Sequence, residues 1–174
     1  MKKLRRISAC REGANVSSPA VETAQKRDRG VIRKAEKTDA KTVAALALRL
    51  WPGHSTEELE AEFCELLADG GCAVFLSEQD GFANGFAQCQ LRHDYVEGTD
   101  SSPVGYLEGI YVAEPYRNRG VASALLAACE DWARQQGCTE FASDCELDNE
   151  DSLKFHLSLG FEEANRIICF RKGL

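Results

Sequence analysis

Apolar and polar positions follow two different repeats along residues 30–174, and together they predict an α/β domain. Runs of apolar and β-branched residues typical of strands lie at 31–33, 72–77, 82–91, 106–112 and 139–143, and a closing hairpin is expected at 161–171. Helical repeats of apolar positions predict four helices, in the stretches 38–50, 55–68, 117–137 and 148–159. The resulting order, β-α-α-β-β-β-α-β-α-β-β, predicts a mixed sheet of about seven strands with helices on both faces.

Short local signals mark the ends of several elements. Ser55 followed by Glu58 is a capping box, which predicts the start of the second helix. The sequence of residues 78–81 is typical of a hairpin turn between two strands. Asp148 or Asn149 is expected to cap the last helix, which a glycine at 160 would end.

Residues 1–29 show no such repeat. They hold eight Lys/Arg and three Asp/Glu, and their composition predicts a disordered basic extension. They contain no continuous apolar stretch like the core of a secretory signal. We therefore expect one domain over residues 30–174, which carry 13 basic and 25 acidic side chains.

Composition narrows the class of protein. A chain of 174 residues that is 44% hydrophobic suits a single core, and no apolar run approaches the roughly 18 residues that a membrane span needs. The acidic domain is expected to repel nucleic acid and to attract polycations, although acidity also serves solubility alone. The eight cysteines form no C-x-x-C pair and no metal-ligand spacing. We therefore expect reduced thiols, a cytoplasmic protein and no bound metal.

The stretch from Tyr106 to Ala128 is a strand, a turn at Pro115 and a helix, and it carries the clearest chemistry. The first N–H groups of a helix have no partner within it, and the small residues Gly120 and Ala122 would let a ligand approach them. Two nearby arginines and the positive end of the helix dipole would favour a pyrophosphate. The alternative is a plain strand, turn and helix with a solvated basic turn. Neither a Walker loop nor a dinucleotide G-x-G-x-x-G motif is present.

Two carboxylates are candidates for recognition of an amine. Glu108 stands two residues before Ile110 in a predicted strand, so the two side chains are expected on one face. Asp144 is expected at the carboxyl end of the adjacent strand, where open α/β sheets bind ligands. Alternatively, Glu108 pairs with an arginine, Asp144 caps a turn, and Trp51, a further candidate, belongs to the core.

The hexapeptide at 117–122 fits R-x-x-G-x-A, and it resembles the coenzyme A signature of the GNAT superfamily of N-acetyltransferases. The predicted order of elements resembles the GNAT fold, whose sheet is splayed at the middle to admit acetyl-CoA. The segments LWPGH (50–54), RHDYVEGTDSSP (92–103), LEGIYV (107–112), FASD (141–144) and LGFEE (159–163) look like those of chromosomal, dimeric aminoglycoside 6′-N-acetyltransferases. The resemblance implies a homodimer that uses acetyl-CoA and acts on an aminoglycoside antibiotic, giving resistance.

The resemblance also implies roles for individual residues. Those expected at the cofactor are Ile110, Tyr111 and Val112 along the pantetheine arm, Arg117, Asn118, Arg119, Gly120, Val121, Ala122 and Ser123 at the pyrophosphate, and Asn149 and His156 further along. Those expected at the acceptor are Trp51, Tyr95, Glu108, Asp144 and Asn165. Two positions depart from the family pattern, because His156 stands where many members have a tyrosine acid, and Asn165 stands where close relatives have an acidic residue.

The expected reaction is direct attack of the 6′-amine on the thioester in a ternary complex. Asp144 is the first candidate for the base and Glu108 the second, while backbone N–H groups of the central strand would polarise the carbonyl. Whether His156 or water protonates the leaving thiolate stays open. Cys145 has no histidine near it in sequence, which disfavours an acyl-enzyme. The alternatives are another polyamine or a protein amine as acceptor, or a regulator that binds acyl-CoA without turnover.

Overall fold

The computed structural model describes residues 30–173, so the extension expected at 1–29 lies outside the described residues. Five strands form one mixed sheet in the order β1-β2-β3-β4-β5. The strands are β1 (Val31–Lys34), β2 (Cys72–Gln79), β3 (Phe82–Arg92), β4 (Val104–Val112) and β5 (Phe141–Ala142). Neighbouring strands are antiparallel except for β4 and β5, which are parallel. The mixed α/β sheet that the sequence predicted is confirmed.

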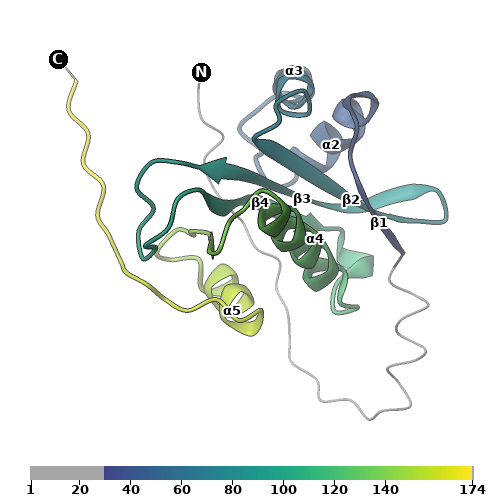
Figure 1. Ribbon diagram of the computed structural model, residues 1–174. Helices are drawn as coiled ribbons and strands as arrows, with labels where there is room; N and C mark the ends of the chain where they lie inside the picture. Colours follow the sequence, from purple (N-terminus) through teal and green to yellow (C-terminus); the bar gives the residue numbers. More distant parts are fainter. Residues whose placement is uncertain (1–29, 174) are drawn as a thin grey trace, which may run out of the picture.

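Residues 30–173 form four α-helices, which lie on two sides of the sheet (Figure 1). They are α2 (Ala40–Ala47), α3 (Thr56–Leu66), α4 (Val121–Gln135) and α5 (Glu150–Ser158), with short 3-10 turns at Lys37–Asp39 and Glu114–Tyr116. Helices α2 and α3 lie on one face, and α4 crosses the other (Figure 1). Phe155 of α5 joins the hydrophobic cluster under α4. The capping box of Ser55 and Glu58 is present at the start of α3. Within residues 30–173, no helix is long and apolar enough to cross a membrane.

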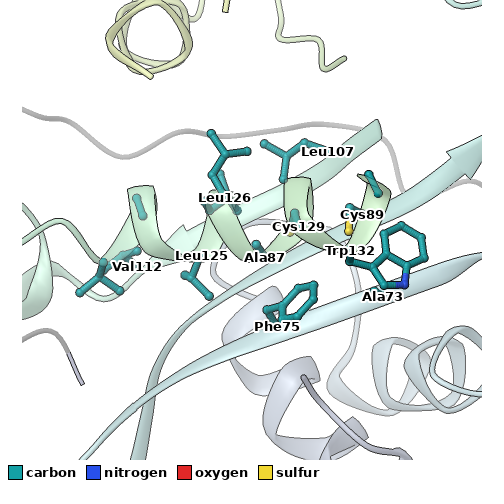
Figure 2. Packing of buried hydrophobic residues seen from close by; sticks show 14 of the residues in the cluster. Ala73, Phe75, Ala87, Cys89, Leu107, Val112, Leu125, Leu126, Cys129 and Trp132 are labelled. Atoms are coloured by element: carbon teal, nitrogen blue, oxygen red, sulfur yellow. The ribbon is translucent and has the colours of Figure 1, made fainter. Parts of the chain in front are cut away.

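Each face of the sheet carries its own hydrophobic cluster. Under α4, the alternate residues Phe75, Ala87 and Leu107 of three strands pack against Leu125 and the rest of the helix (Figure 2). On the opposite face, buried aromatic and aliphatic side chains of α2 and α3 pack on the sheet; they include Val43, Leu50, Trp51, Leu59, Phe63, Leu76 and Phe86. This arrangement follows from the period-2 alternation of the strands and the 3.6 repeat of the helices.

The closing hairpin expected at 161–171 is absent from the described structure, so the sheet has five strands and not about seven. This segment is β-prone, but a strand needs a neighbour with which to pair, and β5, at the edge of the sheet, is only two residues long. Its apolar side chains Ile167, Ile168 and Phe170 are exposed by 62%, 78% and 92%. Local strand propensity therefore predicted two strands at 161–171 that find no partner strand within the described part of this single chain.

β4 is irregular at its middle, and this corrects the expected position of Glu108. Gln88 pairs with Gly109 and Cys89 with Leu107, which leaves Glu108 as an extra residue in a β-bulge. Leu107 and Ile110 consequently both pack in the cluster under α4 although they are three residues apart. Glu108 therefore lies on the face opposite Ile110, and the expectation from simple alternation is wrong.

Candidate active site

β4 and β5 separate soon after they meet. Only two residue pairs join them, Gly105 with Phe141 and Tyr106 with Ala142. Beyond these pairs, no further residue of β5 pairs with β4, so a gap opens between the two strands. The cofactor candidates, together with Glu108 and Asp144, come from β4, the start of α4, α5 and the turn after β5, whereas Trp51, Tyr95 and Asn165 come from other segments.

The turn before α4 forms a cradle of backbone groups. Asn118 has a φ of 59° and Gly120 a φ of 76°, both in the left-handed region, and Gly120 is the N-cap of α4. No side chain caps the helix, and its first turn contains no acidic residue. The N–H groups of that turn thus meet the conditions for an anion site at a helix N-terminus.

A pocket adjoins this cradle. It is lined by Ile110, Val112, Tyr116, Arg117, Asn118, Val121, Ala122 and Phe155. Six of these eight residues were candidates for the cofactor site, and the structure brings them together from β4, the turn and α4. Arg117 is fixed there because its Nε donates to the carbonyl oxygen of Val112 at 2.9 Å. Tyr116 and Phe155 were missed, since their apolar rings gave no signal that distinguishes a pocket wall from core.

Glu108 lies in a hydrogen-bonded network on the face toward α2 and α3. Its Oε1 accepts from Gln90 Nε2 at 2.5 Å and from Arg92 Nε and Nη2 at 3.1 and 2.7 Å. Leu91, between these two residues, packs under α4, so Gln90 and Arg92 point to the other face with Glu108. Burial raises the pKa of Glu108 above its usual range, although the Arg92 hydrogen bond and charge oppose the shift. All three hydrogen bonds go to Oε1, which leaves Oε2 for a ligand.

Asp144 joins the same network through an aromatic residue. Its Oδ1 accepts from the hydroxyl of Tyr106 at 2.8 Å. The guanidinium of Arg92 lies over the Tyr106 ring, 3.2 Å from its centroid, and so links Tyr106 to Glu108. Burial, followed by the Asp144 hydrogen bond, raises the pKa of Tyr106. The structure therefore brings Glu108 and Asp144 into one polar network, in which Glu108 pairs with an arginine, as the alternative for this residue expected.

Gln90, Arg92 and Tyr106 were not among the predicted site residues. A sequence signal did exist, because polar side chains alternate with apolar ones at the end of β3. To predict that these side chains lie beside Tyr106 and Glu108, one must know how β3 pairs with β4, and the bulge shifts this register. The register, and not the composition, decides that these residues belong to the site.

Trp51 forms the floor beneath this part of the sheet. It is 3% exposed and packs edge-on against Phe86, with ring centroids 6.1 Å apart. A Cβ at Gly109 would lie 2.8 Å from two carbons of the Trp51 ring, so the glycine makes room for the indole against the strand. Trp51 is therefore a core residue, which was the alternative to a role at the acceptor, and it lies next to the Glu108 bulge.

Tyr95 and Asn165 are joined to each other through Glu97. The Tyr95 hydroxyl donates to Glu97 Oε2, and Asn165 Nδ2 donates to Glu97 Oε1, both at 2.8 Å. These bonds, that of Asn165 first, lower the pKa of Glu97. Tyr95 is 81% exposed. These side-chain hydrogen bonds link the two predicted acceptor residues with Glu97 and not with Glu108 or Asp144.

Two further cofactor candidates belong to α5, whereas Tyr111 lies in β4, Arg119 just before the N-cap of α4 and Ser123 in its first turn. Asn149 is its N-cap, as expected, and its Oδ1 accepts from the backbone N–H of Ser152 at 3.0 Å. His156 is buried beside Phe155 of the pocket, and its Nε2 lies 2.9 Å from the hydroxyl of Ser143. Burial lowers the pKa of His156. Among the described residues, no group of His, Cys, Asp and Glu side chains could hold a metal ion.

Comparisons with known proteins agree with this geometry. The model of the acetyltransferase (GNAT) family matches residues 40–161. Aminoglycoside N(6′)-acetyltransferase type 1 of Salmonella enteritidis is 46% identical over 141 residues, covering 81% of this chain and 97% of the relative. The protein of that name from Serratia marcescens is 48% identical, covering 75% and 92%. The solved structure of AAC(6′)-Iy with the bisubstrate analog CoA-S-monomethyl-acetylneamine is 45% identical, with a TM-score of 0.79 and coverage of 83% and 98%. The chain therefore belongs to the acetyltransferase (GNAT) family and, within it, to the group of the type 1 aminoglycoside N(6′)-acetyltransferases.

Proposed function

We propose that the protein transfers the acetyl group of acetyl-CoA to the 6′-amine of an aminoglycoside. The observation that carries this proposal is the arrangement at the gap between β4 and β5, where a helix N-terminus with a pocket meets a network of two carboxylates. Similarity to named 6′-acetyltransferases, and to one solved with a conjugate of CoA and acetylneamine, supports the same reaction.

Acetyl-CoA is expected to bind with its pyrophosphate at the start of α4. The N–H groups of Gly120, Val121, Ala122 and Ser123 are the donors, and Arg117, Asn118 and Arg119 flank them. The pantetheine arm follows the edge of β4 at Ile110, Tyr111 and Val112, where β5 no longer pairs with it. Phe155 forms the opposite wall of the pocket, and Asn149 and His156 lie on the same helix.

The acceptor is expected on the side of the carboxylate network. An aminoglycoside carries several ammonium groups, and Glu108 Oε2 and the exposed carboxylate of Asp144 are suited to pair with them. Tyr95 and Asn165, held on Glu97, supply a second polar surface from the loop after β3 and the C-terminal segment. Trp51 supports the network from below through Gly109.

In the reaction, the free amine attacks the thioester carbonyl directly. Asp144 acts as the base that removes a proton from the ammonium, through water, because it is exposed and held by Tyr106. Glu108 is the second candidate, because burial already raises its pKa toward the range in which a carboxylate is a useful base. Backbone N–H groups of β4 in the gap polarise the carbonyl.

The working form is expected to be a cytoplasmic homodimer. Ile167, Ile168 and Phe170 present apolar surface that a single chain leaves exposed, and a second copy can cover it. All seven cysteines of the described residues are free thiols, which suits a reducing compartment. Light scattering at several concentrations tests the dimer directly.

Steady-state kinetics test the activity and its residues together. Release of CoA thiol is measured with kanamycin, with spermidine and without an acceptor, for the wild type, Asp144→Asn and Glu108→Gln. The reading requires turnover with kanamycin, a loss of about 10²–10⁴-fold in kcat for Asp144→Asn, and mainly a raised KM for the drug in Glu108→Gln. Turnover with spermidine alone would redirect the proposal to another polyamine. An Asp144→Asn rate within a few-fold of wild type would leave Asp144 a binding residue.

A further inference from the structure

A chain of hydrogen bonds leads from α5 into the gap between β4 and β5. Ser143 follows β5 directly, and its Oγ lies 2.9 Å from His156 Nε2 and 3.3 Å from the carbonyl oxygen of Leu107. On the other side of the imidazole ring, Nδ1 lies 2.7 Å from the carbonyl oxygen of Ser152. The serine hydroxyl is thus held between the central strand of the site and a buried histidine.

These contacts assign the protons of the pair. A carbonyl oxygen can only accept, so Nδ1 of His156 carries a proton and donates it to Ser152. The imidazole is 8% exposed and favours its neutral form, so Nε2 presents a lone pair. The single hydroxyl proton of Ser143 then has two acceptors, the Leu107 carbonyl oxygen at 3.3 Å and Nε2 of His156 at 2.9 Å, and the shorter distance favours donation to Nε2. Burial lowers the pKa of His156, but the negative charge of Asp144 raises it and so favours transient protonation of the imidazole. The Ser143 hydroxyl thus donates to Nε2 of a neutral imidazole whose Nδ1 is held by a carbonyl oxygen. In this arrangement a serine can pass its proton to histidine.

The position of Ser143 matches the reactive end of the bound cofactor, and this step rests on the proposed function. The pocket begins at the start of α4 and includes Val112 and Ile110 of β4. Because of the bulge, the segment from Val112 to Leu107 covers only the four ladder steps from Gly85 to Cys89, which span roughly 13 Å at about 3.3 Å each. An extended pantetheine arm that runs from the cradle along this edge brings its thioester toward Leu107 and hence toward the Ser143 hydroxyl.

We propose that Ser143, with His156 behind it, carries a proton from the attacking nitrogen to the departing sulfur. When the free amine attacks, the C–N bond forms and the carbonyl π electrons move to oxygen. The positively charged nitrogen then gives a proton to Ser143 Oγ, while the proton of Ser143 passes to His156 Nε2. The oxyanion then reforms the C=O bond as the C–S bond breaks and its electron pair goes to sulfur. Ser143 protonates the sulfur, and His156 Nε2 returns the proton to Oγ. Both side chains end as they began, and the products are the amide and the CoA thiol.

Single-turnover kinetics with excess enzyme test the shuttle, because product release cannot then mask the chemical step. Ser143→Ala should lower the rate constant of acetyl transfer by about 10²–10³-fold, the scale of general acid–base catalysis, and Ser143→Thr should restore most of it. His156→Gln keeps a polar contact with Ser143 but cannot take up the proton, so it should lose as much. The double variant should be no slower than either single variant, because the two residues act as one unit. The matched control is Ser158→Ala, whose hydroxyl donates only to the Phe155 carbonyl and should leave the rate unchanged.

A purely structural role would give a different pattern. The rise in melting temperature on adding acetyl-CoA should stay within about 1 °C of wild type in Ser143→Ala, since the hydroxyl is not part of the cradle. A rate for Ser143→Ala within about threefold of wild type would overturn the shuttle, and so would losses that multiply in the double variant. The variants are compared with whichever of kanamycin and spermidine the wild type acetylates. A wild type that does not acetylate kanamycin counts against the proposed function, whereas the shuttle is judged by the variants alone.

Discussion

Replacing Arg92 by methionine should destabilise the protein by about 2–4 kcal/mol, and most of that loss should be due to Glu108. Removal of one partner from a fully buried ion pair costs about 3–5 kcal/mol, whereas exposed pairs contribute less than about 1. The side chain of Glu108 is 13% exposed and that of Arg92 is 35% exposed, so the pair lies between these limits, at about 1.5–3 kcal/mol. Loss of the cation–π contact with Tyr106 adds about 0.5–1 kcal/mol.

The dependence on pH separates the charge of Glu108 from simple loss of packing. Burial raises the folded-state pKa of Glu108 and Arg92 lowers it, so removal of Arg92 raises it further. Between the unfolded and the folded pKa, the folded state holds a proton that the unfolded state has released. Stability therefore falls as pH rises through this window. The cost of Arg92→Met should be small near pH 4.5 and should grow toward pH 7.

Urea unfolding of four proteins, the wild type, Arg92→Met, Glu108→Gln and the double variant, measures these effects. Adding Glu108→Gln to Arg92→Met should recover about 1–2 kcal/mol at pH 7 and abolish the growth with pH, because no buried charge is left. Arg134→Met is the control, since Arg134 is 63% exposed and pairs with Glu130 and Asp131 on the surface of α4. Its cost should stay below about 1 kcal/mol. A cost of Arg92→Met that is independent of pH, or that Glu108→Gln does not relieve, would refute the reasoning.

Three further variants probe other parts of the molecule. Ser123→Glu places a negative charge in the first turn of α4, where it suits the helix dipole but repels a pyrophosphate. Calorimetry should show that acetyl-CoA binds at least about tenfold more weakly to this variant, while its melting temperature without ligand stays unchanged. The uncharged control Ser123→Gln should bind acetyl-CoA almost normally. Gly109→Ala should lower the free energy of unfolding by about 1–3 kcal/mol, because its Cβ would overlap Trp51. Gly70→Ala is the control for a thermal melting assay, because a Cβ at Gly70 has no atom within 4 Å, and it should leave the stability unchanged. Ile168→Asp should shift the mass measured by light scattering from dimer to monomer, and the equally exposed Leu147→Asp should not; a dimer in both would place the interface elsewhere.

The sequence predicted best what depends on neighbouring residues. The Ser55–Glu58 capping box and the Asn149 cap each need only a few adjacent side chains, and both are present. The hairpin turn expected at 78–81 is also present, but it is confined to Asp80 and Gly81 because Glu78 and Gln79 pair within β2. The polar network needed more, because Arg92 meets Glu108 only through the register of two strands. Alternation placed Glu108 on the wrong face, since a bulge depends on tertiary packing and has no dependable local signal. The closing hairpin failed for a related reason, because strand propensity does not reveal whether a partner strand is available.

The bulge makes the length of β4 itself a determinant of the site. Glu108 and Gly109 lie opposite the same residue of β3, at one level of the ladder, and both face α2 and α3. Glu108 supplies a carboxylate there, whereas Gly109, which has no side chain, leaves room for the indole of Trp51. Deletion of one residue between Leu107 and Ile110 would restore strict alternation and keep both of these core positions under α4. Only one residue would then be left for the opposite face at that level, so a carboxylate and a glycine floor could no longer occur together. A substitution can change the charge of this site, whereas insertion or deletion of a single residue in β4 decides whether the two features can coexist.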